Sequence, residues 1–105
     1  MSDSLDKLFA TIASRKGADP STSYTAKLLA AGVEKCAKKF GEEATEAVIA
    51  AIQKDKAELA KESADVLYHL AVLWAASGIT PEDVYAVLKS REAMSGLEEK
   101  AGRKG

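Results

Sequence analysis

Two pairs of acidic residues with the same spacing are the feature of this sequence best suited to chemistry. Glu43 and Glu46 form one pair, and Glu62 and Asp65 form the other. Three residues are just under one turn of an α-helix, so each pair projects from one helix face. Four carboxylates that converge from two neighbouring helices repel one another unless a cation neutralises them. Carboxylate oxygens favour hard cations, and a site that keeps some waters suits Mg²⁺ bound with substrate phosphates. We therefore expect a magnesium site, in which Mn²⁺ can substitute.

The position of the pairs on their helices bears on whether they form a site or a solvated surface. A single Glu-x-x-Glu is common on exposed helix faces and indicates little by itself. On a helical wheel, however, Glu43 borders the apolar side of its helix, and Glu62, Asp65 and His69 border that of the next. This favours carboxylates that point into the bundle over solvated acids. A di-iron site is disfavoured, because it usually needs Glu-x-x-His pairs and neither pair ends in His.

Basic residues near the acidic pairs are candidates for binding phosphate. Lys35 and Lys39 precede Glu43 by one to two turns, and Lys39 shares its face. Lys27 and Arg91 are further candidates, because cations of this kind contact phosphate oxygens. Each has an ordinary alternative. A lysine on an exposed helix face is common, and Arg91 can instead pair with an acid while its stem packs inward.

The pattern along the chain predicts helices and no strands. Ala, Leu, Lys and Glu dominate, and no run of alternating β-branched residues occurs. We expect five helices, over about 2–16, 23–32, 33–53, 57–76 and from Thr80 onward, where Thr80 caps and Pro81 takes the first helical position. Lys54–Lys56 is expected to be a polar turn. Gly41 marks either a kink or close packing within the long helix.

The two long helices each carry an apolar stripe at three- and four-residue spacing. In the helix over 33–53 the stripe is Val33, Ala37, Phe40, Ala44, Ala47, Val48 and Ala51. In the helix over 57–76 it is Leu59, Ser63, Val66, Leu70, Leu73 and Trp74. Trp74, Tyr68 and Tyr85 are aromatic residues able to stack on an adenine or a partner helix, and packing is the better interpretation for Trp74.

Composition bounds the core and the class of the protein. Twenty of the 105 residues are Ala, so large apolar side chains are few. We expect one all-α domain over 1–105, a small bundle of four to five helices completed by dimerisation. A net charge of −1 argues against nucleic-acid binding, which needs a basic surface. Cys36 is alone and is expected to be a small core residue. With no signal peptide and no apolar run of about 20 residues, we expect a soluble cytoplasmic protein that binds no membrane.

The acidic pairs also resemble a known metal motif. Glu-x-x-Glu followed by Glu-x-x-Asp on the next helix is similar to the motif of the all-α nucleotide pyrophosphohydrolases. Within that superfamily the sequence resembles the phosphoribosyl-ATP pyrophosphatases of histidine biosynthesis. Four stretches carry the resemblance: SYTAKL (23–28), GEEATE (41–46), ESADVLYHL (62–70) and SGLEEK (95–100).

The resemblance implies an activity and a set of ligands. The implied enzyme hydrolyses phosphoribosyl-ATP to phosphoribosyl-AMP and pyrophosphate with Mg²⁺. One Cys and one His leave no ligands for the zinc cyclohydrolase to which such domains are often fused, so the stand-alone form is expected. Carried over by position, the metal ligands and catalytic residues are Glu43, Glu46, Glu62 and Asp65. Glu42 is assigned to contacts through water, and His69 to a hydrogen bond that orients Asp65.

Two other functions stay open from the sequence. One is the hydrolysis of canonical or damaged nucleoside triphosphates by a house-cleaning member of the same superfamily, which a substrate panel distinguishes. The other is a non-catalytic helical dimerisation module whose acids are solvated. Titration with Mg²⁺ distinguishes this module, because a true site raises the melting temperature.

Overall fold

The computed structural model describes residues 3–92, and in this range the chain forms five α-helices and no strand. They are α1 (Asp3–Ser14), α2 (Tyr24–Ala31), α3 (Val33–Ile52), α4 (Lys56–Ser77) and α5 (Pro81–Glu92). The expected all-α class is confirmed, and the helix bounds differ from the predicted ones by a residue or two. The stretch over 95–100 and the C-terminal tail lie outside the described residues.

Local hydrogen bonds explain where the helices begin and end. The Ser23 hydroxyl and the Asp55 carboxylate each accept a backbone N–H three residues ahead, at 3.1 and 3.0 Å, and so cap α2 and α4. Before α5, the Thr80 hydroxyl accepts from the Asp83 N–H at 3.3 Å, and the Asp83 carboxylate accepts from the Thr80 N–H at 2.9 Å. Gly78, with φ of 79°, ends α4 in the left-handed region.

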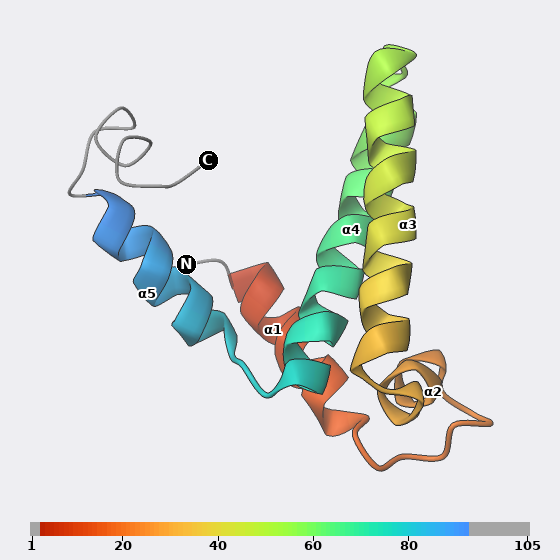
Figure 1. The fold of residues 1–105 in the computed structure, drawn as a ribbon, viewed down its shortest axis with the longest axis vertical. Helices are drawn as coiled ribbons and strands as arrows, with labels where there is room; N and C mark the ends of the chain where they lie inside the picture. Colours follow the sequence, from red (N-terminus) through yellow and green to blue (C-terminus); the bar gives the residue numbers. More distant parts are fainter. Residues whose placement is uncertain (1–2, 93–105) are drawn as a thin grey trace.

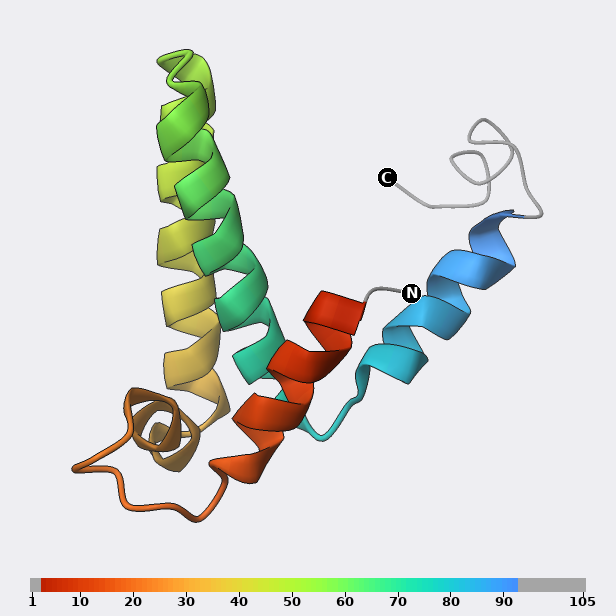
Figure 2. The same ribbon diagram turned by 180° about the vertical axis from the view of Figure 1, so that it is seen from behind.

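Helices α3 and α4 form an antiparallel hairpin and lie side by side in both views (Figures 1 and 2). A short turn joins them, and in it Lys54 has a φ of 60°. Helix α3 continues through Gly41. The suggestion of close packing there is wrong within the described chain, because a Cβ on Gly41 would meet nothing within 4 Å.

The other three helices lie around the open end of this hairpin. Helix α1 packs on α4, and the short α2 packs on both α3 and α4 at the end opposite the turn (Figure 1). Helix α5 leads away from the hairpin (Figure 2). In the range described, none of the five helices has both the length and the apolar character needed to cross a bilayer.

A small core lies where α1, α2 and the hairpin meet. Its buried members are Ile12, Leu28, Cys36, Ala71 and Val72. The thiol of Cys36 donates a hydrogen bond to the Leu28 carbonyl at 3.2 Å, and the side chain is fully buried. The prediction that Cys36 is a core residue is confirmed.

The predicted apolar stripe of the long helix is partly wrong. Val33 and Val48 are 45% and 56% exposed, whereas Cys36 and Ala50 are buried. Because α3 is apolar on more than one face, only its docking on α4 decides which face becomes the interior. A second face remains uncovered in the single chain, and it ends at Ile52, which is 74% exposed.

Candidate functional site

Three of the predicted ligands meet between α3 and α4. Carboxylate oxygens of Glu43, Glu62 and Asp65 all lie within 4.8 Å of one another. Glu62 is buried, and the other two are half-buried. Within residues 3–92, this is the acidic cluster compact enough to hold one cation, and all of its donors are oxygens, which hard divalent cations prefer.

Glu46 lies beside this cluster rather than within it. It is exposed, one turn further along α3, and its carboxyl hydrogen-bonds to that of Glu43. The structure therefore brings the fourth predicted ligand to the rim of the cluster, next to the other three.

The electrostatics of the cluster are those of carboxylates held too close together. The hydrogen bond with Glu46, then burial, then the charges of Glu46, Asp65 and Glu62 raise the pKa of Glu43 to about 7. Burial, followed by a hydrogen bond with Asp65, raises the pKa of Glu62. The free energy of these groups thus falls when a cation or a proton neutralises them.

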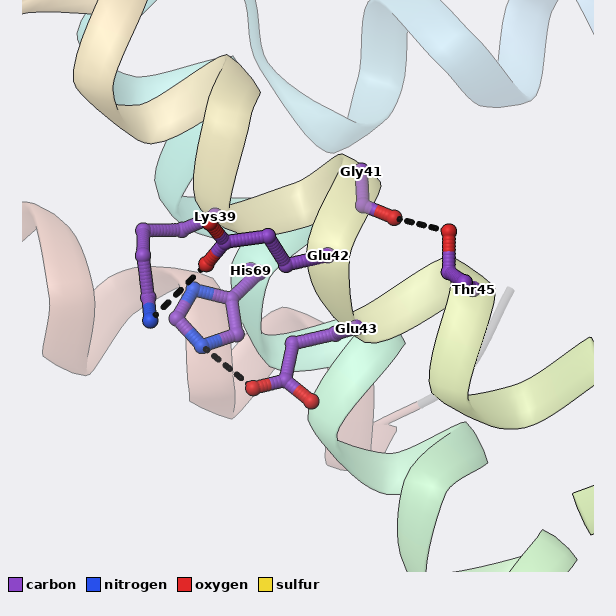
Figure 3. Close-up of polar contacts among 6 residues, drawn as sticks. All are labelled: Lys39, Gly41, Glu42, Glu43, Thr45 and His69. Atoms are coloured by element: carbon purple, nitrogen blue, oxygen red, sulfur yellow. Dashed lines mark hydrogen bonds and ion pairs between the residues drawn. The ribbon is translucent and has the colours of Figure 1, made fainter. Parts of the chain in front are cut away.

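His69 faces the cluster from α4, one turn after Asp65. Its Nε2 lies 3.9 Å from the Glu43 Oε1 (Figure 3). His69 therefore contacts Glu43, whereas the sequence had led us to expect a hydrogen bond to Asp65. The sequence could not show this, because it depends on how the two helices are rotated against each other. Burial, and next the charge of Lys39, lower the pKa of His69. The surroundings of His69 therefore favour the neutral form of the imidazole.

The other nitrogen of His69 is unusual. Nδ1 is buried and has no hydrogen-bond partner among the described residues. The ring is instead met edge-on by Tyr68 and Tyr24, with ring centroids 4.9 and 6.4 Å away.

Glu42 points to a different neighbour from Glu43. Its carboxylate pairs with the Lys39 ammonium at 3.2 Å (Figure 3). The assignment of Glu42 to contacts through water stays a prediction. Together with Glu43, Thr45 and Glu46, Glu42 and Lys39 line an acidic hollow of about 440 Å³.

Three of the four predicted cationic residues share a second hollow. Lys27 and Lys35 line it together with Lys39, and its volume is about 260 Å³. We call it the basic hollow. Since Lys39 also lines the acidic hollow, the two adjoin. Arg91 lies elsewhere, exposed on α5 in a separate hollow with Val87 and others, so one chain does not bring it to the acidic cluster.

The structure adds one residue that sequence reasoning missed. Tyr24 is 53% exposed and lines the basic hollow with Lys27. Its spacing from Lys27, three residues on a helix that begins after Ser23, was a usable signal, since such positions share a face. The aromatic residues considered from the sequence make other contacts: Trp74 is buried, and the Tyr85 hydroxyl donates to Asp6 at 2.8 Å.

Comparison with known proteins places this geometry in context. A family model described as phosphoribosyl-ATP pyrophosphohydrolase matches residues 5–92. Proteins named phosphoribosyl-ATP pyrophosphatase are similar over nearly their whole length. One from Cereibacter sphaeroides is 62% identical over 94% of this chain and 96% of its own. One from Paracoccus denitrificans is 61% identical over 95% of this chain and 93% of its own.

Proposed function

This chain belongs to the phosphoribosyl-ATP pyrophosphohydrolase family, and from that membership we propose that it hydrolyses phosphoribosyl-ATP to phosphoribosyl-AMP and pyrophosphate, an early step of histidine biosynthesis. The chain is an enzyme rather than the non-catalytic helical module considered from the sequence. The observation that carries the proposal is the cluster of Glu43, Glu62 and Asp65 oxygens within 4.8 Å, beside a hollow lined by lysines.

The acidic cluster fits Mg²⁺, with Mn²⁺ as a substitute. Its donors are all oxygens, and the raised pKa of Glu43 indicates negative charge that lacks a counter-charge. Glu43, Glu46, Glu62 and Asp65 would hold the ion. Bound Mg²⁺ supplies neutralisation of the phosphate oxygens as the bond to pyrophosphate breaks.

The chain's own side chains then bind and orient the phosphates. Lys39 lies between the acidic and basic hollows, where its ammonium can meet a phosphate that also faces the carboxylates. Lys35 would hold further phosphate oxygens in the basic hollow. Water adds across the pyrophosphate linkage between the α- and β-phosphates, a carboxylate of the cluster accepts its proton, and pyrophosphate leaves. Glu42 keeps Lys39 in place through their ion pair.

A direct assay tests the proposed activity. Purified protein with phosphoribosyl-ATP and Mg²⁺ should release pyrophosphate, and Glu46→Gln, which keeps the shape of the side chain, should release far less. A parallel panel of canonical and damaged nucleoside triphosphates tests the house-cleaning alternative. Faster hydrolysis of any of these than of phosphoribosyl-ATP would contradict the proposal.

We also propose that the single domain over 1–105 acts as a cytoplasmic homodimer. The uncovered face of α3 carries Val48, Ile49 and Ile52, which are 56%, 48% and 74% exposed in the single chain. Apolar surface of this kind is stabilised when a second copy covers it.

A further inference from the structure

A third hollow adjoins the basic hollow. It has a volume of about 560 Å³ and is lined by Pro20, Ser21, Thr22, Ser23, Tyr24 and Lys27. We call it the outer hollow. Tyr24 and Lys27 line both it and the basic hollow. The three hollows therefore form a series, joined first at Lys39 and then at Tyr24 and Lys27.

We propose that the outer hollow binds the phosphoribosyl group of the substrate, with Lys27 contacting its phosphate and Tyr24 stacking on the adenine. This inference rests on the proposed function. Phosphoribosyl-ATP is an elongated molecule with a triphosphate at one end, the adenine in the middle and a second ribose phosphate at the other end. When the triphosphate lies at the acidic cluster, the far end must extend past Lys39, and the series of hollows leads it to the outer one.

The chemistry of the outer hollow suits a sugar phosphate. Its lining contains four hydroxyl side chains, those of Ser21, Thr22, Ser23 and Tyr24, and one ammonium group, and it includes no carboxylate. The loop before α2 is held by its own hydrogen bonds: Ser21 donates to the Asp19 carboxylate from both N and Oγ, at 2.9 and 2.8 Å. Hydroxyl oxygens keep lone pairs that accept from ribose hydroxyls. Lys27 supplies the positive charge that a phosphate dianion needs.

Contacts with its neighbours fix the position of Tyr24, which lines both the basic and the outer hollow. The next residue, Thr25, hydrogen-bonds to the Tyr68 hydroxyl and so ties α2 to α4. The Tyr24 ring also lies perpendicular to the ring of the buried His69, with the two ring centroids 6.4 Å apart. A ring that is fixed at one side and 53% exposed offers a face on which a base can stack.

Two small probes separate the ends of the substrate: ribose 5-phosphate for the outer hollow and pyrophosphate for the acidic one. In Lys27→Met, the KM for phosphoribosyl-ATP and the inhibition constant of ribose 5-phosphate should each rise about tenfold or more, since a charge-assisted hydrogen bond is lost. The inhibition constant of pyrophosphate should change less than twofold. Lys7→Met, on α1 and outside all three hollows, is the matched control. For the stack, Tyr24→Ala should raise the KM about tenfold, while Tyr24→Phe should retain the wild-type value.

The outcomes distinguish this inference from the proposed function. If the wild type releases no pyrophosphate, the proposed function fails, yet ribose 5-phosphate binding can still be followed by NMR through the Tyr24 ring signals. Equal loss of affinity for both probes in Lys27→Met would place Lys27 at the triphosphate and overturn the inference. So would failure of millimolar ribose 5-phosphate to inhibit the wild type or to move the Tyr24 signals.

Discussion

Replacing Glu43 by Gln should stabilise the metal-free protein and, at the same time, abolish its stabilisation by Mg²⁺. Glu43 shares a space within 4.8 Å with two other carboxylates, and its pKa is raised to about 7. Gln has the shape of the protonated acid but cannot ionise. The substitution therefore removes the repulsion that the folded state imposes and also removes a ligand.

The size of this stabilisation follows from the distance between the carboxylates and from the pKa of Glu43. Two unit charges 4.8 Å apart repel by about 0.9 kcal/mol in bulk water and by about 3.5 kcal/mol at an effective dielectric constant of about 20. When the pKa of an acid is higher in the folded than in the unfolded state, ionisation of that acid lowers the free energy of unfolding. For Glu43 this decrease occurs as the pH rises from 4.5 to about 7. Wild type and Glu43→Gln should thus melt at similar temperatures near pH 4.5. Above pH 7 the variant should be more stable by about 1–3 kcal/mol. Each kcal/mol should raise the melting temperature by about 4–8 °C.

Thermal melts at pH 8, in EDTA and in excess Mg²⁺, measure both effects. With Mg²⁺ at about a hundred times its Kd, the wild type should gain about 2.7 kcal/mol, and the variant should gain much less. Glu34→Gln, which removes one charge from an exposed position on the same helix, is the matched control. If Glu43→Gln melts below the wild type in EDTA, repulsion at Glu43 does not destabilise the fold; if Mg²⁺ shifts both proteins equally, Glu43 is not a ligand.

Three further predictions concern the contact between α2 and α4, the core and the proposed interface. Tyr68→Phe removes the hydrogen bond to Thr25 and should lower the free energy of unfolding by about 0.5–1.5 kcal/mol in urea titrations; an unchanged midpoint would contradict this. Cys36 is fully buried, and burial raises the pKa of its thiol, so a maleimide should label it only at the rate of unfolding. Rapid labelling of the native protein would show that this packing is wrong. If the proposed dimer forms, Ile52→Glu should convert it to monomer in sedimentation experiments; a wild type already sedimenting as monomer would exclude the proposed interface.

Helix bounds were predictable because their causes are local. Ser23 and Thr80 cap the helices that follow them through bonds to residues three positions ahead, and Gly78 ends α4 by its own backbone conformation. Such signals need no knowledge of the rest of the fold. The same holds for the acidic pairs, since the three-residue spacing alone places each pair on one face.

What the sequence could not supply depends on how the helices dock. Val48 and Ala50 are both apolar and two positions apart on α3, and only contact with α4 makes Ala50 interior and leaves Val48 exposed. The contact of His69 with Glu43 has the same origin, because Glu43 lies on α3 and comes within reach only through the way in which α3 docks against α4. The place of Tyr24 beside the lysines depends on where the short α2 packs, which local patterns do not encode.

The two acidic motifs lie at matching heights on the hairpin. Glu46 comes six residues before Ile52, the end of α3, and Glu62 comes six residues after Lys56, the start of α4. The equal number of residues between each motif and the turn therefore keeps the two motifs opposite each other. One residue inserted in either helix between a motif and the turn would rotate that motif by about 100° away from its counterpart. Insertions and deletions are therefore expected to be tolerated in the turn between α3 and α4. A few residues to either side of the turn, they should separate the two motifs and abolish the site.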